Sequence, residues 1–139
     1  MIKRVSDVVV AHHHRLFDSF DAVAEDLAPE SIAALEKEIG RHFAVEEELF
    51  HPRLDDPWLA LRHVSEEHAV LTYAMERVAH GGSPEQREAR LRVARDMFVA
   101  HVELEERFVL PTLELTLGSI ESRRLAALFL RQLRLAGPR

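Results

Sequence analysis

Apolar residues recur at spacings of three and four positions along most of this chain. In the first such stretch they are Val5, Val9, Leu16, Phe20, Val23 and Leu27. This spacing places the side chains on one face of a helix, where they can pack into a core. The pattern therefore predicts a first helix over residues 6–27, which stops at Pro29 because proline interrupts helical hydrogen bonds.

Further long helices follow from the same spacing and from the residues that begin or end helices. The second starts at Glu30 and bends or ends at Pro52. In the DDPW segment, residues 55–58, an aspartate cap precedes a proline in the first turn, which predicts a third helix over residues 57–80. The glycine pair 81–82 closes that helix.

A fourth helix opens at residues 83–85, where the succession of cap and proline occurs again. It continues at least to Pro111 and at most to Leu117. The pair 118–119, glycine and serine, separates a fifth and shorter helix that reaches about residue 135.

Long helices joined by short loops are typical of an antiparallel bundle. We therefore predict an all-α fold, an up-down-up-down antiparallel four-helix bundle over residues 1–118. Residues 119–139 are predicted to form an additional C-terminal amphipathic helix that packs on the same domain. The second and fourth helices would lie diagonally across such a bundle.

Composition and charge narrow the class of protein. The chain has 139 residues, 47% of them apolar and 30% charged, which suits one folded helical domain. Its net charge of −6 argues against nucleic acid as the main partner. It has no cysteine, so any metal must be bound by nitrogen and oxygen. Neither a signal peptide nor an apolar stretch of about 20 residues is evident, so we expect a cytoplasmic protein without membrane contact.

One polar pattern occurs twice. HFAVEEELFHPRL, residues 42–54, and HVELEERFVLPTL, residues 101–113, share H-x3-E-E-x4-P-x-L. Positions i and i+4 lie about 40° apart around a helix, so the histidine and the first glutamate of each motif share a face. In the second helix that face also carries apolar residues. The second glutamate, at i+5, projects about 140° away and is not expected to face the core.

These paired residues are His42 with Glu46 and His101 with Glu105. Burying such groups without partners costs several kcal/mol, so four of them inside one bundle need compensation. A pair of metal ions provides it. Imidazole and carboxylate together suit iron, manganese or zinc, and two carboxylates that bridge two ions suit a dinuclear centre.

The first and third helices also offer histidines. On the third, His68 is in register with apolar residues, whereas His63 lies on another face and is expected to pair with Glu67 at the surface. On the first, the run 12–14 leaves two inward alternatives, of which we favour His13 over His12. Two other histidines, His51 and His80, are expected to be structural, with His51 facing away. The candidate walls of the centre, with ordinary core packing as the alternative for each, are Phe17, Phe43, Phe50, Leu71 and Phe98.

This order and spacing of histidines and H-x3-E-E motifs, each followed by a proline, resembles the hemerythrin-like family, the HHE cation-binding domains. The likeness covers about residues 5–115. The family's fold is a four-helix bundle around a non-haem di-iron centre. The resemblance thus implies two iron ions, joined by an oxo or hydroxo bridge, as the cofactor. It also implies that Glu46 and Glu105 bridge the irons and that the terminal ligands are His13, His42, His68 and His101.

The chain departs from the oxygen-carrying hemerythrins in two ways. They have H-x3-H on the third helix, but here Val64 and Thr72 stand four residues either side of His68. They have H-x4-D on the fourth helix, where this chain has H-x3-E, as many bacterial members do. The lacking nitrogen donor implies an additional open or water-filled position on one iron, which argues against simple oxygen carriage.

The resemblance implies a di-iron protein that binds or turns over O2, hydrogen peroxide or nitric oxide, and leaves open whether it is an enzyme. The alternative is an iron- or oxygen-sensing or iron-handling module that a protein partner reads, because metal binding couples to folding. The last 19 residues, 121–139, hold five arginines and one glutamate beside an apolar stripe. We expect this helix to dock on the bundle, with a homo-oligomer or protein partner as the alternative.

Overall fold

The computed structural model describes residues 3–54 and 59–135, and their secondary structure is helical. The expected cap at residues 55–58 lies outside the described residues. The elements in chain order are α1 (Val5–Asp26), α2 (Pro29–Leu49), the 3-10 turn η1 (His51–Arg53), α3 (Leu59–Ala79), α4 (Pro84–Leu104), the π-helical turn η2 (Glu105–Val109) and α5 (Leu110–Leu135).

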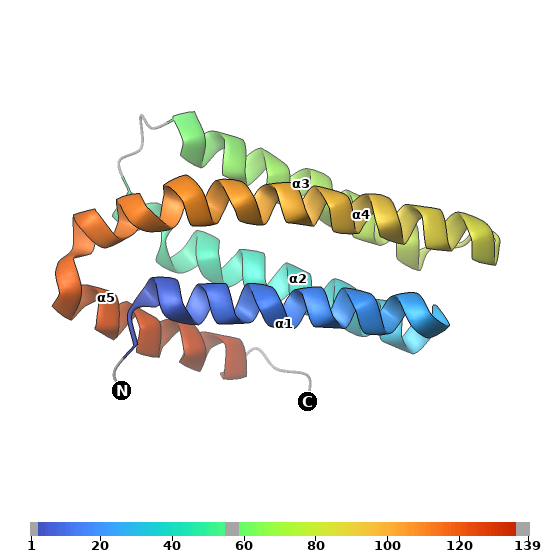
Figure 1. Ribbon diagram of the computed structural model, residues 1–139, viewed down its shortest axis with the longest axis horizontal. Coiled ribbons are helices and arrows are strands. Elements are labelled where there is room, and N and C mark those ends of the chain that lie inside the picture. The colour runs from blue at the N-terminus through green and yellow to red at the C-terminus, as the bar shows by residue number, and fades with distance from the viewer. Residues whose placement is uncertain (1–2, 55–58, 136–139) are drawn as a thin grey trace.

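The first four helices form the predicted antiparallel bundle (Figure 1). Neighbouring pairs are α1 with α2, α2 with α3, α3 with α4, and α1 with α4. The chain therefore runs around a square, and α2 and α4 occupy opposite corners. This arrangement confirms the predicted fold class and sets the two H-x3-E motifs facing each other across the bundle axis.

The fourth helix of the bundle is longer than α4 alone. It continues through η2 into the first part of α5, and then bends at Gly118, whose φ of 74° and ψ of 174° interrupt the helix. Only glycine adopts this conformation readily. The predicted break at the pair 118–119 is thus confirmed, and the rest of α5 turns back to pack against α1 and α2 (Figure 1).

Other helix boundaries also follow local sequence signals. The Ser83 hydroxyl accepts a hydrogen bond from the Gln86 backbone N–H, and the Gln86 side chain accepts one from the Ser83 N–H, so α4 begins with a capping box. Gly81, just beyond α3, has a φ of 91°. These contacts confirm the predicted start of the fourth helix.

The apolar core is divided into two clusters, one towards each end of the bundle. One contains Val9, Leu49, Val64 and Val109, and the other contains Leu16, Phe43, Leu71 and Phe98, each with further apolar neighbours. On α1 and α3 a buried histidine, His13 or His68, lies between the residues of one cluster and those of the other, and on α2 and α4 the buried His42 and His101 lie where the second cluster ends and the first begins. A polar layer therefore crosses the middle of the bundle.

No helix within the described ranges is both long enough and apolar enough to cross a membrane.

Candidate metal centre

The polar layer consists of the residues predicted from the sequence. Each is at most 2% exposed: His13 on α1, His42 and Glu46 on α2, His68 on α3, His101 on α4 and Glu105 at the start of η2. The choice of His13 over His12 agrees with this burial, since His12 is only partly buried and His14 is exposed. The metal-ligand roles of the six residues stay predictions.

Their donor atoms form two overlapping groups. One group is His13, His42, Glu46 and Glu105, and the other is Glu46, His68, His101 and Glu105. Within each group, one donor atom per residue lies within 4.8 Å of all the others. Both groups contain two imidazoles and share the same two carboxylates, so they define two adjacent positions with equal sets of donors.

Several atoms at the centre lack hydrogen-bond partners among the described residues. His42 Nε2 lies 2.6 Å from Glu46 Oε1, and His13 Nε2 lies 3.1 Å from Glu105 Oε1, but neither pair has the angles of a hydrogen bond. Both Glu105 carboxylate oxygens are likewise unpartnered. Buried polar atoms without partners are costly, and a cation among these nitrogens and oxygens would satisfy them together. The donor set fits a pair of metal ions.

The backbone is specialised where the fourth helix carries its second motif. Within η2, the Leu110 N–H donates to the Glu105 carbonyl, five residues earlier, instead of four. A π turn of this kind inserts one residue into the helical ladder. Glu105, at the start of this turn, is fully buried, and the next residue, Glu106, reaches the outer side of the centre.

Each of three histidines contacts a carboxylate on the side away from the centre. The Nδ1 of His13 lies 2.7 Å from Glu106 Oε2, that of His68 lies 2.9 Å from Glu47 Oε1, and that of His101 lies 3.0 Å from Glu67 Oε1. A carboxylate can only accept, so Nδ1–H donates, and Nε2 of each ring is directed at the centre, where it has a lone pair for a metal ion when the ring is neutral. This carboxylate–histidine arrangement is typical of metal sites, where it holds the ring and its tautomer.

These three glutamates were missed as contributors in the sequence. Glu47 and Glu106 were expected to face away from the core, and they are indeed partly exposed, but their long side chains reach back to the outer imidazole nitrogens. The sequence feature that could have identified Glu47 and Glu106 is the repeated second glutamate of the E-E pair in both motifs. Glu67 does pair with His63 at 3.5 Å, as expected, and also accepts from His101.

His42 has a different outer partner. Its Nδ1 lies 2.6 Å from the Nδ1 of His12, and the two rings are stacked with centroids 4.8 Å apart. Burial lowers the pKa of His42 well below its usual range, and burial followed by repulsion from His13, Arg15 and Arg41 lowers the pKa of His12 to about 4. Both rings are therefore neutral, and a donor N–H on His42 paired with an acceptor on His12 leaves His42 Nε2 free.

The two central carboxylates have opposite pKa shifts. Burial, together with the neighbouring Glu105, raises the pKa of Glu46 well above its usual range. Burial also acts on Glu105, but Glu46, His101 and His13 outweigh it and lower the pKa of Glu105. Two buried carboxylates side by side therefore favour a state with fewer than two negative charges when no metal ion is present.

The pKa values of the buried histidines are likewise shifted in opposite directions. Burial opposes the charged form of His13, but the carboxylates of Glu105 and Glu106 outweigh it and raise the pKa of His13. Glu105 and Glu67 do the same for His101, whose pKa rises to about 9. Burial lowers the pKa of His68 to about 3. Without a metal ion, the negative charge of Glu105 therefore favours the protonated forms of His13 and His101.

Aromatic rings enclose the layer. Phe43 stacks on His68 with centroids 4.0 Å apart, and Phe98 meets His13 edge to face with centroids 6.2 Å apart. Phe17 packs on Phe98, with ring centroids 5.2 Å apart. The sequence did not single out Phe129 of α5, whose ring lies 5.9 Å from that of His42.

The expected position of His51 was wrong. The α-helical geometry ends at Leu49, and the 3-10 turn that follows redirects His51, so that its ring stacks 6.1 Å from that of His68. His51 also lines a cavity of about 400 Å³ together with Leu61, Ser65 and other residues. It therefore lies between the exterior and the buried centre.

Comparison with known proteins agrees with these features. A family model described as the hemerythrin HHE cation binding domain matches residues 4–113, most of the chain. No curated protein and no solved structure matched the chain.

Proposed function

Because the chain belongs to the hemerythrin HHE cation-binding domain family, we propose that it holds two iron ions in its polar layer. The two donor groups that share Glu46 and Glu105 are the observation that carries this proposal. In it, His13 and His42 are terminal ligands of one ion and His68 and His101 of the other, while both glutamates bridge them. Nitrogen and oxygen donors suit iron, and the family match favours iron over zinc or manganese.

The proposed activity is the binding or turnover of O2, hydrogen peroxide or nitric oxide. When bound, an iron pair supplies open positions for such a molecule and the electrons for its reduction. Each donor group offers two imidazoles and two carboxylates, fewer donors than an octahedral ion accepts. Open positions would then remain on the ions, among them the additional one that the missing histidine on α3 implies.

The protein's own residues orient the ligands and limit access. Carboxylates on the outer nitrogens of His13, His68 and His101 keep their Nε2 atoms directed inwards. Phe43 and Phe98 exclude bulk water from the imidazoles that they cover. His51 and the cavity that it lines provide the approach for a small molecule from outside.

Metal content and visible spectra of the purified protein test the proposal. We expect two irons per chain and near-ultraviolet charge-transfer bands that bleach with dithionite and return with peroxide. Replacing His42, His101 or Glu46 with alanine should abolish dinuclear loading, whereas His14→Ala, on an exposed face of α1, should leave it unchanged. A Glu46→Ala variant that still binds two irons per chain would contradict the ligand assignment.

One contact favours a second candidate function, the sensing of iron or oxygen. Phe129 of α5 packs against both His12 and His42, so a change at the centre reaches the surface through α5. In this case α5 is the surface that a protein partner or a second copy of the chain reads. Hydrogen exchange over residues 119–135 should then be much faster in iron-free protein than in loaded protein. Equal protection in both states, with rapid peroxide turnover, favours catalysis instead.

A further inference from the structure

A second cavity lies outside the polar layer, between α1, α2 and the end of α5. It has a volume of about 560 Å³, within the range of small-molecule sites. None of the six proposed ligands lines it. Its walls are His12, Arg15, Ala34, Lys37, Glu38, Arg41, Leu130, Leu133 and Arg134.

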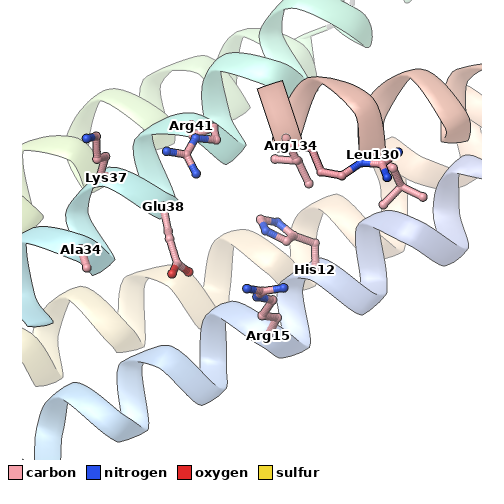
Figure 2. Close-up of a pocket in the computed structure, with 9 residues that line it drawn as sticks. His12, Arg15, Ala34, Lys37, Glu38, Arg41, Leu130 and Arg134 are labelled. Atoms are coloured by element: carbon pink, nitrogen blue, oxygen red, sulfur yellow. The ribbon is translucent and has the colours of Figure 1, made fainter. Parts of the chain in front are cut away.

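The lining is strongly basic, although the whole chain carries a net charge of −6. Four cationic side chains, Arg15, Lys37, Arg41 and Arg134, and one carboxylate, Glu38, line the cavity. Figure 2 shows the guanidinium groups of Arg15 and Arg41 on either side of the space, with the His12 ring between them. Positive charge is therefore concentrated in this cavity.

The cations of the cavity are available to a ligand. None of the four forms an ion pair with a described residue, whereas Arg92, Arg95 and Arg124 elsewhere on the surface do. The one acidic group, Glu38, accepts a hydrogen bond from the Ser19 hydroxyl at 3.3 Å.

The shape of the ligand follows from the remaining walls. Ala34, Leu130 and Leu133 add an apolar side to the basic one. A guanidinium binds phosphate or carboxylate oxygens in pairs. The two guanidinium groups of Arg15 and Arg41, on either side of the space, match a phosphate monoester, which carries nearly two charges and three acceptor oxygens. We propose that this cavity binds a small organic phosphate monoester with an apolar body.

The cavity is linked to the proposed iron centre by one residue. His12 lines the cavity, and its Nδ1 lies 2.6 Å from the Nδ1 of His42. A phosphate group held by Arg15 and Arg41 moves or holds the His12 ring, and the hydrogen bond passes this to His42. Only this link rests on the proposed function, because binding in the cavity requires no metal.

Calorimetric titration of the full chain with phenyl phosphate tests the binding site. We expect saturable binding at one site per chain, weakened at least tenfold in Arg15→Gln/Arg41→Gln. The matched control is Arg92→Gln/Arg124→Gln, which removes the same charge from exposed ion pairs and should change the affinity less than twofold. Circular dichroism checks that both variants fold, and Lys37→Gln, at an exposed position, provides a second test.

Other probes separate the alternatives. Benzoate and benzenesulfonate carry one charge on the same ring and should bind at least tenfold more weakly than phenyl phosphate. Tighter binding of either one, or an equal loss of affinity in both double variants, would overturn the proposed site. Vesicles with and without phosphatidic acid show whether the phosphate group is taken from a lipid or from a free molecule.

The link to the centre is measured as reciprocal coupling. Saturating phenyl phosphate should change the affinity for iron(II), in wild type and in His12→Asn, which keeps an acceptor near His42. The change should vanish in His12→Leu. If phenyl phosphate binds but no variant shows coupling, the link is wrong and the site stands. If no iron binds at all, the proposed function fails while the phosphate titration is unaffected.

Discussion

The outer contact between Glu67 and His101 allows a test that leaves all six proposed ligands in place. Glu67 Oε1 accepts from His101 Nδ1 at 3.0 Å, and it is one of two carboxylates that raise the pKa of His101 to about 9. In Glu67→Ala the ring loses the partner that holds its tautomer and its orientation. Comparable losses in metal sites weaken metal binding about 10- to 100-fold, or by about 1.4–2.7 kcal/mol.

The effect should be confined to one of the two metal positions. His101 belongs to the group with His68, whereas His13 and His42 form the other group. A chelator competition titration of Glu67→Ala should therefore show one iron bound with nearly wild-type affinity and one bound 10- to 100-fold more weakly. In wild type the two affinities should lie closer together.

A matched control is available in the neighbouring residue. Glu66 is exposed on the same helix and makes none of the contacts described for Glu67, so Glu66→Ala removes the same charge without disturbing the centre. His63→Ala removes the other partner of Glu67 and should also have little effect. The reasoning is refuted if Glu67→Ala binds both irons as tightly as Glu66→Ala does.

Three further predictions concern the stability of the iron-free protein in urea titrations. The raised pKa of His101 means that folding favours its protonated form. The stability that this proton contributes is complete below about pH 6.5 and is lost as the pH rises through about 9, so the free energy of unfolding should fall over that window. A rise over the same window would contradict the shift. Gly118→Ala should lower the free energy of unfolding by about 1–3 kcal/mol, because Gly118 has a positive φ of 74°. Gly40→Ala should raise it by about 0.5–1 kcal/mol, because Gly40 lies in the middle of α2 with open space around it. Phe129→Ala should cost about 3–5 kcal/mol, since its ring is fully buried against Phe50 and His42; a cost below about 1 kcal/mol would mean that α5 is not part of the core.

Sequence alone determined the features that depend on the period of a helix. Apolar spacing, prolines and glycines predicted the helices, the break at Gly118 and the antiparallel bundle, because each of these signals acts within a few residues of the chain. The H-x3-E spacing selected His42 with Glu46 and His101 with Glu105 as inward pairs, and all four are buried. Repetition in both halves of the chain pointed to one shared centre.

Tertiary structure decided how these residues are supported and what lies beside them. The carboxylates of Glu47, Glu67 and Glu106 reach histidines on other helices, so their roles depend on helix packing and not on spacing within one helix. The π turn at Glu105–Val109 changes the local register, and the 3-10 turn brings His51 beside His68. The basic cavity combines side chains from three helices. Distances across a bundle are set by the packing of whole helices, which no local pattern specifies.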